Sequence, residues 1–173
     1  MKSTLIIYST TDGQTLEICN KIFSKLNVSE SSEITHISKA EGLDLNQFDK
    51  IIIGASIRYG KHKPELYEFI KKNVDCLETK ENAFFSVNVV ARKPEKNTPE
   101  TNPYMQKFLE LSPWSPKKLA VFAGKIDYPK YKFIDKHMIR LIMWITKGPT
   151  DVKNTYEFTD WNQVDEFSKQ LNT

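Results

Sequence analysis

The chain alternates short apolar runs with longer segments in which apolar residues recur at helical spacing. Five runs are rich in β-branched or aromatic residues, which is typical of β-strands: Thr4–Tyr8, Glu33–Ile37, Lys50–Gly54, Ala83–Val90 and Leu119–Ala123. The third run, KIIIG, is continuously apolar, as strands covered on both faces tend to be. It is therefore predicted to lie at the centre of a sheet.

Four segments between and after these runs are predicted to be helices because their apolar residues fall on one face. These residues are Leu16, Cys19, Ile22, Phe23 and Leu26; Leu66, Phe69, Ile70 and Val74; Tyr104, Phe108 and Leu111; and Trp161, Val164, Phe167 and Leu171. Pro64 and Pro103 suit a first helical turn, and Asn102 and Asp160 suit the cap before it. Strands that alternate with such helices form parallel βαβ units. The sequence thus predicts one α/β domain, residues 1–173, with a five-stranded parallel sheet and helices on both faces.

The segment Lys125–Pro149, KIDYPKYKFIDKHMIRLIMWITKGP, breaks this alternation and is interpreted as an insertion. Up to Lys147 it has six basic and two acidic residues, a net charge of +4 against +3 for the whole chain. Its apolar residues suit an amphipathic helix, within residues 128–146, that lies on a membrane surface beside anionic lipid. The alternative is a helix packed on its own sheet or at a dimer seam.

The overall composition is that of a globular protein, with 39% hydrophobic and 27% charged residues. A net charge of +3 is too small to indicate nucleic acid as a partner. The two cysteines, Cys19 and Cys76, fall in apolar helical stripes and are expected to be small buried hydrophobic residues. The cysteine usage, the lack of a signal-peptide pattern and the lack of an apolar run of about 18 residues predict a cytoplasmic protein.

The first strand runs into YSTTDGQT, Tyr8–Thr15, a loop with many hydrogen-bonding side chains and no positive charge. In a parallel sheet, such a loop lies where the N-terminus of the next helix attracts a phosphate. The GxxxxGK(S/T) pattern of nucleotide triphosphate hydrolases and the GxGxxG dinucleotide pattern are both absent. The loop is interpreted as a site for one monoester phosphate, without a metal, in which Asp12 caps or turns the loop. The alternative is an ordinary connection between strand and helix.

Two more loops would reach the same edge of the sheet: GASIRYGKHKP, Gly54–Pro64, and SVNVVARKPEK, Ser86–Lys96. The first supplies the aromatic ring of Tyr59, and the second supplies small and amide side chains. Together with the phosphate loop, these two loops indicate a binding site for a ligand that has a flat ring system and a phosphate tail.

These stretches resemble the flavodoxin fold with FMN and, within it, the menaquinone-dependent protoporphyrinogen IX dehydrogenases of bacterial heme synthesis. The resemblance is carried by YSTTDGQT, IIIGASIRYGKH, SVNVVARKPEKNTPETN, DYPKYKFIDKHMIRLIMWITKG and EFTDW, which span nearly the whole chain. It implies the strand order 2-1-3-4-5. It also implies that FMN oxidises protoporphyrinogen IX to protoporphyrin IX and passes the electrons to menaquinone or another quinone. The protein would then attach peripherally to the inner (cell) membrane through residues 128–146.

The resemblance further implies which residues hold the cofactor. The phosphate would lie on Ser9, Thr10, Thr11, Asp12, Gly13, Gln14 and Thr15. The isoalloxazine ring would lie against Ile57, Arg58, Tyr59, Gly60, Ser86, Val87, Asn88, Val89 and Ala91. Some relatives have arginine at position 11, where this chain has threonine, so N–H and O–H donors would hold the phosphate.

Basic residues crowd the two loops that would flank the ring: Arg58, Lys61, Lys63, Arg92, Lys93 and Lys96. They would favour an anionic reduced flavin and attract the propionates of a porphyrinogen. The candidate substrate-binding residues are Arg58, Arg92 and Lys93, and solvated loop charges are the alternative. His62 is the candidate catalytic residue because its loop should lie near the ring, with a surface histidine as the alternative.

Two other redox functions fit the same fold. An electron-carrier flavodoxin would have acidic residues around the flavin, whereas these loops are basic. A soluble NAD(P)H:quinone reductase would take hydride from NADPH. A phospho-receiver domain is disfavoured because the end of the first strand lacks an acidic pair.

Overall fold

Five parallel strands form the sheet at the centre of the molecule. A computed structural model describes all residues, 1–173. The strands are β1 (Thr4–Ser9), β2 (Glu33–His36), β3 (Lys50–Ser56), β4 (Glu81–Val87) and β5 (Lys118–Phe122). They pair in the order β2-β1-β3-β4-β5. The predicted α/β fold and the strand order 2-1-3-4-5 are confirmed.

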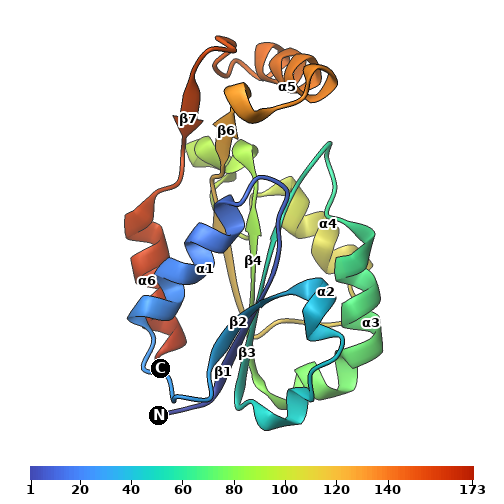
Figure 1. The fold of residues 1–173 in the computed structure, drawn as a ribbon, viewed down its shortest axis with the longest axis vertical. Helices are drawn as coiled ribbons and strands as arrows, with labels where there is room; N and C mark the ends of the chain where they lie inside the picture. The colour runs from blue at the N-terminus through green and yellow to red at the C-terminus, as the bar shows by residue number, and fades with distance from the viewer.

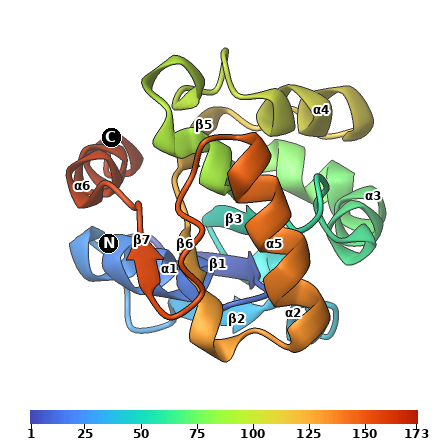
Figure 2. The same ribbon diagram turned by 90° about the horizontal axis from the view of Figure 1, so that it is seen from above.

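Helices cover both faces of this sheet (Figure 1, Figure 2). One face packs against α1 (Gln14–Lys25) and α6 (Trp161–Leu171), and the other against α2 (Ile37–Ala40), α3 (Pro64–Thr79) and α4 (Pro103–Leu111). Successive residues of β3 alternate between the two cores: Ile51 and Ile53 face α3 and α4, and Ile52 faces α1 and α6. Because both faces are covered, the strand is apolar from Ile51 to Ala55.

The predicted helix starts are confirmed. Asn102 accepts hydrogen bonds from two backbone N–H groups at the start of α4, and Asp160 accepts from two at the start of α6. Pro64 and Pro103 occupy the first turns of their helices. These positions satisfy or remove donors that a first helical turn leaves unpaired.

Strand β4 ends at Val87, three residues before its predicted end at Val90. The strand stops because the side-chain oxygen of Asn88 accepts from the N–H of Ala91 at 3.1 Å and begins a 3₁₀ helix, η2 (Val89–Arg92). Two more short 3₁₀ turns that were not predicted are η1 (Leu45–Gln47) and η3 (Pro94–Lys96).

The two cysteines differ in their surroundings. Cys19 is buried between α1 and α6, as predicted. Cys76 is only half-buried, so the expectation that it is a buried residue is wrong. It lies at the edge of the core, where its thiol approaches the side chain of Asn46 at 3.8 Å.

The segment between β5 and α6 lies beyond the carboxyl ends of the central strands (Figure 1). It forms β6 (Lys125–Asp127), the 3₁₀ helix η4 (Tyr128–Lys130), α5 (Phe133–Ile145) and β7 (Thr155–Glu157), and β6 pairs antiparallel with β7. A small core of Ile126, Tyr128, Ile139 and Met143 joins α5 to this pair. Seen from above, α5 crosses over the end of the sheet (Figure 2). None of the helices has the length and apolar content needed to cross a bilayer.

Candidate functional site

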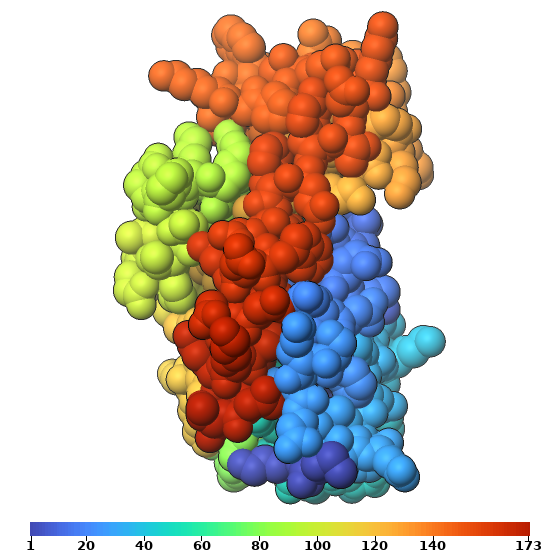
Figure 3. All heavy atoms as spheres, turned by 90° about the vertical axis from the view of Figure 1, so that its left-hand side faces the viewer, coloured from blue at the N-terminus to red at the C-terminus, as the bar shows by residue number.

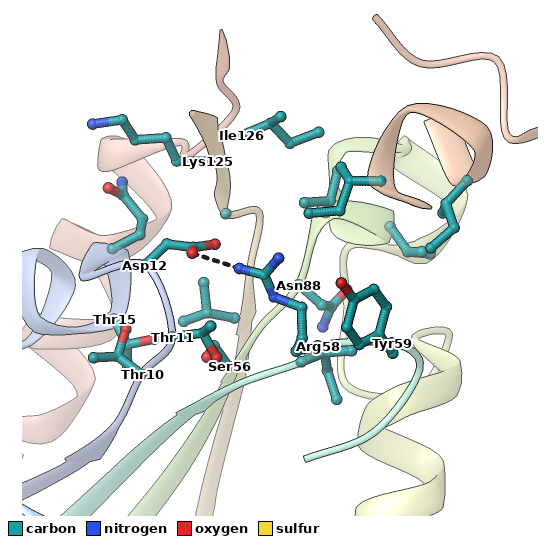
Figure 4. Close-up of a pocket in the computed structure, with 18 of the residues that line it drawn as sticks. Thr10, Thr11, Asp12, Thr15, Ser56, Arg58, Tyr59, Asn88, Lys125 and Ile126 are labelled. Carbon is teal, nitrogen blue, oxygen red and sulfur yellow. Dashed lines mark hydrogen bonds and ion pairs between the residues drawn. The ribbon is translucent and has the colours of Figure 1, made fainter. Parts of the chain in front are cut away.

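A cavity opens at the carboxyl edge of the sheet, beside α5 (Figure 4). Its empty volume, counted out to its open mouth, is about 830 Å³. The loops after β1, β3 and β4 line it, together with Tyr104 and parts of the segment Gly124–Met143. Parallel α/β sheets bind their ligands at this edge.

The loop after β1 presents unpaired donors to this cavity. Gly13, with a φ of 90°, is the cap residue of α1 but has no side chain to accept a hydrogen bond. The N–H groups of the first turn therefore have no side-chain partner. The hydroxyl of Thr15 is also buried without a hydrogen-bond partner. An anion such as a phosphate would satisfy both sets of donors.

The side chain of Asp12 makes no hydrogen bond within its own loop, so the expectation that it caps or turns this loop is wrong. The hydroxyl of Thr10 does so instead, by accepting from the backbone N–H of Gly13 at 3.0 Å. Asp12 pairs with Arg58, whose Nη2 lies 2.5 Å from Asp12 Oδ1 (Figure 4). Burial raises the pKa of Asp12, and the neighbouring guanidinium of Arg58 opposes that rise.

The loop after β3 makes a tight turn that projects Tyr59 toward α5. Tyr59 and Gly60 have positive φ angles of 51° and 79°, and the N–H of Arg58 donates to the carbonyl of Lys61 at 3.1 Å. Two consecutive left-handed residues are typical of a two-residue hairpin turn. Tyr59 is 46% exposed, and its hydroxyl donates to Asp135 of α5.

Asn88, in the loop after β4, lines the cavity and belongs to a buried chain of polar side chains. Its amide nitrogen lies 3.2 Å from Ser86 Oγ and 3.3 Å from Asn102 Oδ1, and Asn102 donates back to Asn88 Oδ1 at 3.0 Å. Ser86 Oγ lies in turn 3.0 Å from His62 Nε2. Because all four side chains are buried, these bonds hold the loop in one conformation.

His62 is buried at the end of this chain, so its interpretation as a surface histidine is wrong. The rings of Tyr67, Phe84 and Phe108 surround it at centroid distances of 6.4, 5.8 and 5.9 Å. Burial lowers the pKa of His62 to about 4. It does not line the cavity, and its hydrogen bond to Ser86 connects it to Asn88, which does.

Most of the predicted cofactor-binding residues come together in the cavity: Thr10, Thr11, Asp12, Gln14, Thr15, Ile57, Arg58, Tyr59, Gly60, Val87, Asn88 and Val89. Four do not line it: Ser9, Gly13, Ser86 and Ala91. The hydroxyl of Ser9 donates instead to Glu65 at 2.8 Å. The amide of Gln14 donates to Glu157 and Thr159, both at 2.9 Å, and so ties this loop to the end of β7.

Sequence reasoning missed ten lining residues: Ser56, Val90, Tyr104, Gly124, Lys125, Ile126, Tyr131, Ile139, Ile142 and Met143. Six of them lie in Lys125–Pro149, the segment whose charge predicts an insertion rather than a part of this cavity. The residues of α5 that face the cavity follow the same helical spacing as the exposed ones. The pattern alone therefore does not tell the two faces apart.

Of the six basic residues in the flanking loops, Arg58 alone lines the cavity. Arg92 donates to the carbonyls of Val89 and Thr146, both at 3.0 Å, and so anchors the end of α5. Lys63 donates to the carbonyl of Thr10 at 2.8 Å. Lys93 lies outside the lining. The expected rim of free positive charge is thus reduced, because Asp12 and backbone carbonyls accept from three of these side chains.

This fold and cavity agree with the comparisons with known proteins. A family model described as a flavodoxin domain matches residues 5–153. The fold is similar to that of oxidised Flavodoxin 1 from Bacillus cereus, with a TM-score of 0.52 at 16% identity, over 98% of this chain and 96% of that one. The chain is therefore a flavodoxin-domain protein.

Two relatives identify a narrower family within this class. Protoporphyrinogen IX dehydrogenase (quinone) from Escherichia coli (strain K12) is 43% identical over 169 residues, which cover 97% of this chain and 93% of the relative. The protein of the same name from Leishmania major is 40% identical, over 96% of this chain and 73% of the relative. The chain belongs to the protoporphyrinogen IX dehydrogenase (quinone) family of flavodoxin-domain proteins.

Proposed function

We propose that the protein uses FMN to oxidise protoporphyrinogen IX to protoporphyrin IX and passes the electrons to a quinone such as menaquinone. The cavity is the observation that supports this most directly. It offers unpaired N–H groups and the free hydroxyl of Thr15 at one end, and aromatic and apolar side chains at the other. FMN has a matching anionic tail and flat ring. The name that both relatives share supplies the substrate and the acceptor.

The residues present fit this cofactor. Its phosphate would lie on the loop Thr10–Thr15, where Gly13 leaves the start of α1 without a side-chain cap. Its ring would lie between Ile57–Gly60 and Val87–Val89. Bound FMN would supply the electron-transfer chemistry.

The chain itself would contribute position, charge and exclusion of water. No histidine lines the cavity, and its one acidic lining residue, Asp12, is paired with Arg58. We therefore assign no essential proton-transfer residue, and His62 is better described as part of the core that supports Asn88. Of the three predicted substrate-binding residues, we retain Arg58, because Arg92 anchors α5 and Lys93 lies outside the lining.

An anaerobic assay of porphyrin formation tests this proposed function. The purified protein should show a flavin absorbance spectrum and should form fluorescent porphyrin from protoporphyrinogen IX when a menaquinone analogue is added. Flavin without quinone-dependent porphyrin formation would contradict the proposal. Reduction of the quinone by NADPH alone, without porphyrinogen, would favour a soluble quinone reductase, and electron exchange only with a protein partner would favour an electron carrier.

We also propose that α5 attaches the protein to the surface of the cell membrane. Its outer face exposes large apolar side chains: Phe133 (77% exposed), Ile134 (74%), Trp144 (72%) and Ile145 (65%). Basic residues lie on or beside the same helix: Lys130, Lys132, Lys136, Arg140 and Lys147. α5 forms the end of the molecule opposite the two termini (Figure 1, Figure 3). Apolar and basic side chains together favour an interface with anionic lipid.

Vesicles that contain anionic phospholipid test this attachment. The double substitution Ile134→Glu with Trp144→Glu should abolish co-sedimentation and leave the bound flavin unchanged. Leu111→Glu is the matched control, because Leu111 is a 56% exposed apolar residue on α4. Retained vesicle binding in the double variant would contradict the proposal. A wild-type dimer that the double substitution dissociates, without any vesicle binding, would favour the dimer seam.

A further inference from the structure

The guanidinium of Arg58 uses one of its edges and leaves a buried donor on another. Nη2 donates to Asp12 Oδ1 at 2.5 Å, across the cavity between the loops after β3 and β1 (Figure 4). Nη1 is buried and has no hydrogen-bond partner. A buried cationic donor without an acceptor is destabilising, so the position calls for an anion.

The surroundings hold this guanidinium in place. Its Cζ lies 5.1 Å from the centre of the Tyr131 ring and 5.8 Å from that of Tyr59, within the range of cation–π contacts. The hydroxyl of Tyr131 donates to the second carboxylate oxygen of Asp12 at 3.3 Å. The side chain of Arg58 is only 16% exposed. Arg58 is therefore fixed between two aromatic rings and one carboxylate, with Nη1 shielded from water.

The other basic side chains nearby are already engaged. Lys63 donates to the carbonyl of Thr10, and Arg92 donates to the carbonyls of Val89 and Thr146. Lys125 lines the cavity from β6 but has no unpartnered buried donor. Arg58 is thus the residue in this cavity with a free, buried cationic donor.

We propose that Nη1 of Arg58 binds an oxyanion of the molecule that occupies the cavity, and that Asp12 is a positioning residue that holds the guanidinium there. A guanidinium has donors on more than one edge and can bind two oxyanions at once. Two ligands of the proposed function, on which this inference rests, present such a group. One is the phosphate monoester of the cofactor, and the other is a carboxylate of the porphyrinogen.

The test compares each ligand with a counterpart that lacks the oxyanion. Fluorescence quenching gives the Kd of FMN and of riboflavin, and anaerobic kinetics give the KM of protoporphyrinogen IX and of its dimethyl ester. The wild-type protein should prefer the anionic member of at least one pair by about tenfold or more. Arg58→Gln should remove most of that preference. The pair that responds identifies which oxyanion Arg58 binds.

Lys61→Gln is the matched control, because it removes a positive charge from the same turn at a residue that does not line the cavity. It should leave both ratios within about twofold of the wild type. Equal Kd and KM values within both pairs in the wild-type protein would overturn the proposal, and so would ratios that Arg58→Gln leaves unchanged. If Arg58→Gln does not fold, Arg58→Lys takes its place, because it keeps the positive charge but loses the planar guanidinium; it should lower the same ratio, and a ratio that it leaves unchanged would overturn the proposal.

Asp12→Asn tests the positioning role. Removal of the nearby negative charge of Asp12 would by itself strengthen the binding of an anionic ligand. Weaker binding of that ligand in this variant would therefore show that Arg58 is no longer held in position. We expect a higher Kd or KM with kcat unchanged, and no further loss when Arg58→Gln is added. Tighter binding of the anion, or a change in kcat alone, would overturn this role. A protein that binds FMN but does not oxidise the porphyrinogen would refute the proposed function, while the flavin pair would still test Arg58.

Discussion

The hydroxyl of Tyr59 donates a hydrogen bond to the carboxylate of Asp135, which joins the turn after β3 to helix α5. Tyr131 makes a second such connection, from the segment before α5 to Asp12 in the loop after β1. One side-chain bond thus ties the loop after β3 to α5, and another ties the loop after β1 to the residues just before α5. Each such bond contributes only about 0.5–1.5 kcal/mol. We therefore expect α5 to open more readily than the sheet beneath it.

Tyr59→Phe should loosen α5 while reducing the free energy of unfolding by less than about 1 kcal/mol, because the pair is exposed. Amide hydrogen exchange of residues 133–145 should become faster, and that of β1 and β3 should not change. Tyr104→Phe is the control, since Tyr104 also lines the cavity but its hydroxyl makes no hydrogen bond within the protein. Unchanged exchange in Tyr59→Phe would show that the bond does not hold α5.

Thr15→Val should affect stability and cofactor binding in opposite directions. The buried hydroxyl of Thr15 has no partner, so its replacement by a methyl group should leave the cofactor-free protein equally stable or stabilise it by about 1 kcal/mol. The same change should weaken FMN binding by about tenfold and riboflavin binding much less, because only FMN has the phosphate. Urea denaturation and flavin fluorescence measure the two effects. An equal loss of affinity for both flavins would place the phosphate elsewhere.

The two helix caps Asn102 and Asp160 should differ in their contribution to stability. Asp160→Ala removes an exposed cap and should cost about 1 kcal/mol. Asn102→Ala also removes the two buried hydrogen bonds between Asn102 and the amide of Asn88, so it should cost about 2–4 kcal/mol. Urea midpoints at constant m-value give the comparison. Equal losses would mean that the buried chain of polar side chains adds nothing to the cap.

His62 should make the protein less stable as the pH falls. Its pKa is lowered to about 4 in the folded protein, below the value of about 6.5 in an unfolded chain, so the unfolded state binds more protons between these values. The associated stability is complete above about pH 6.5 and is lost progressively toward pH 4, by about 3 kcal/mol in all. His62→Gln should show a shallower loss in urea denaturation over this range. Identical slopes for the two proteins would contradict the burial of a neutral imidazole.

Local patterns were enough to predict the sheet. The KIIIG run, the proline starts of α3 and α4 and the caps Asn102 and Asp160 each depend on neighbouring residues, and all were found. The three-residue strands β6 and β7 were missed because they are too short to show a period of two.

The candidate site was predicted less completely, because its missing parts depend on contacts between distant segments. Nothing near Asp12 in the sequence reveals that Arg58 pairs with it. The sequence likewise does not reveal that Ser9 donates to Glu65 or that His62 is buried against aromatic rings. Loop composition therefore identified the cavity, whereas the role of each polar side chain within it depended on the fold.

The ratio of quinone reduced to porphyrin formed tests the central proposal most directly. Conversion of protoporphyrinogen IX to protoporphyrin IX removes six electrons, and each quinone accepts two. In an anaerobic assay with purified, flavin-loaded protein, we expect three molecules of a menaquinone analogue to be reduced for each porphyrin that becomes fluorescent. Porphyrin formation at the same rate without any quinone, or quinone reduction without porphyrin, would contradict the account.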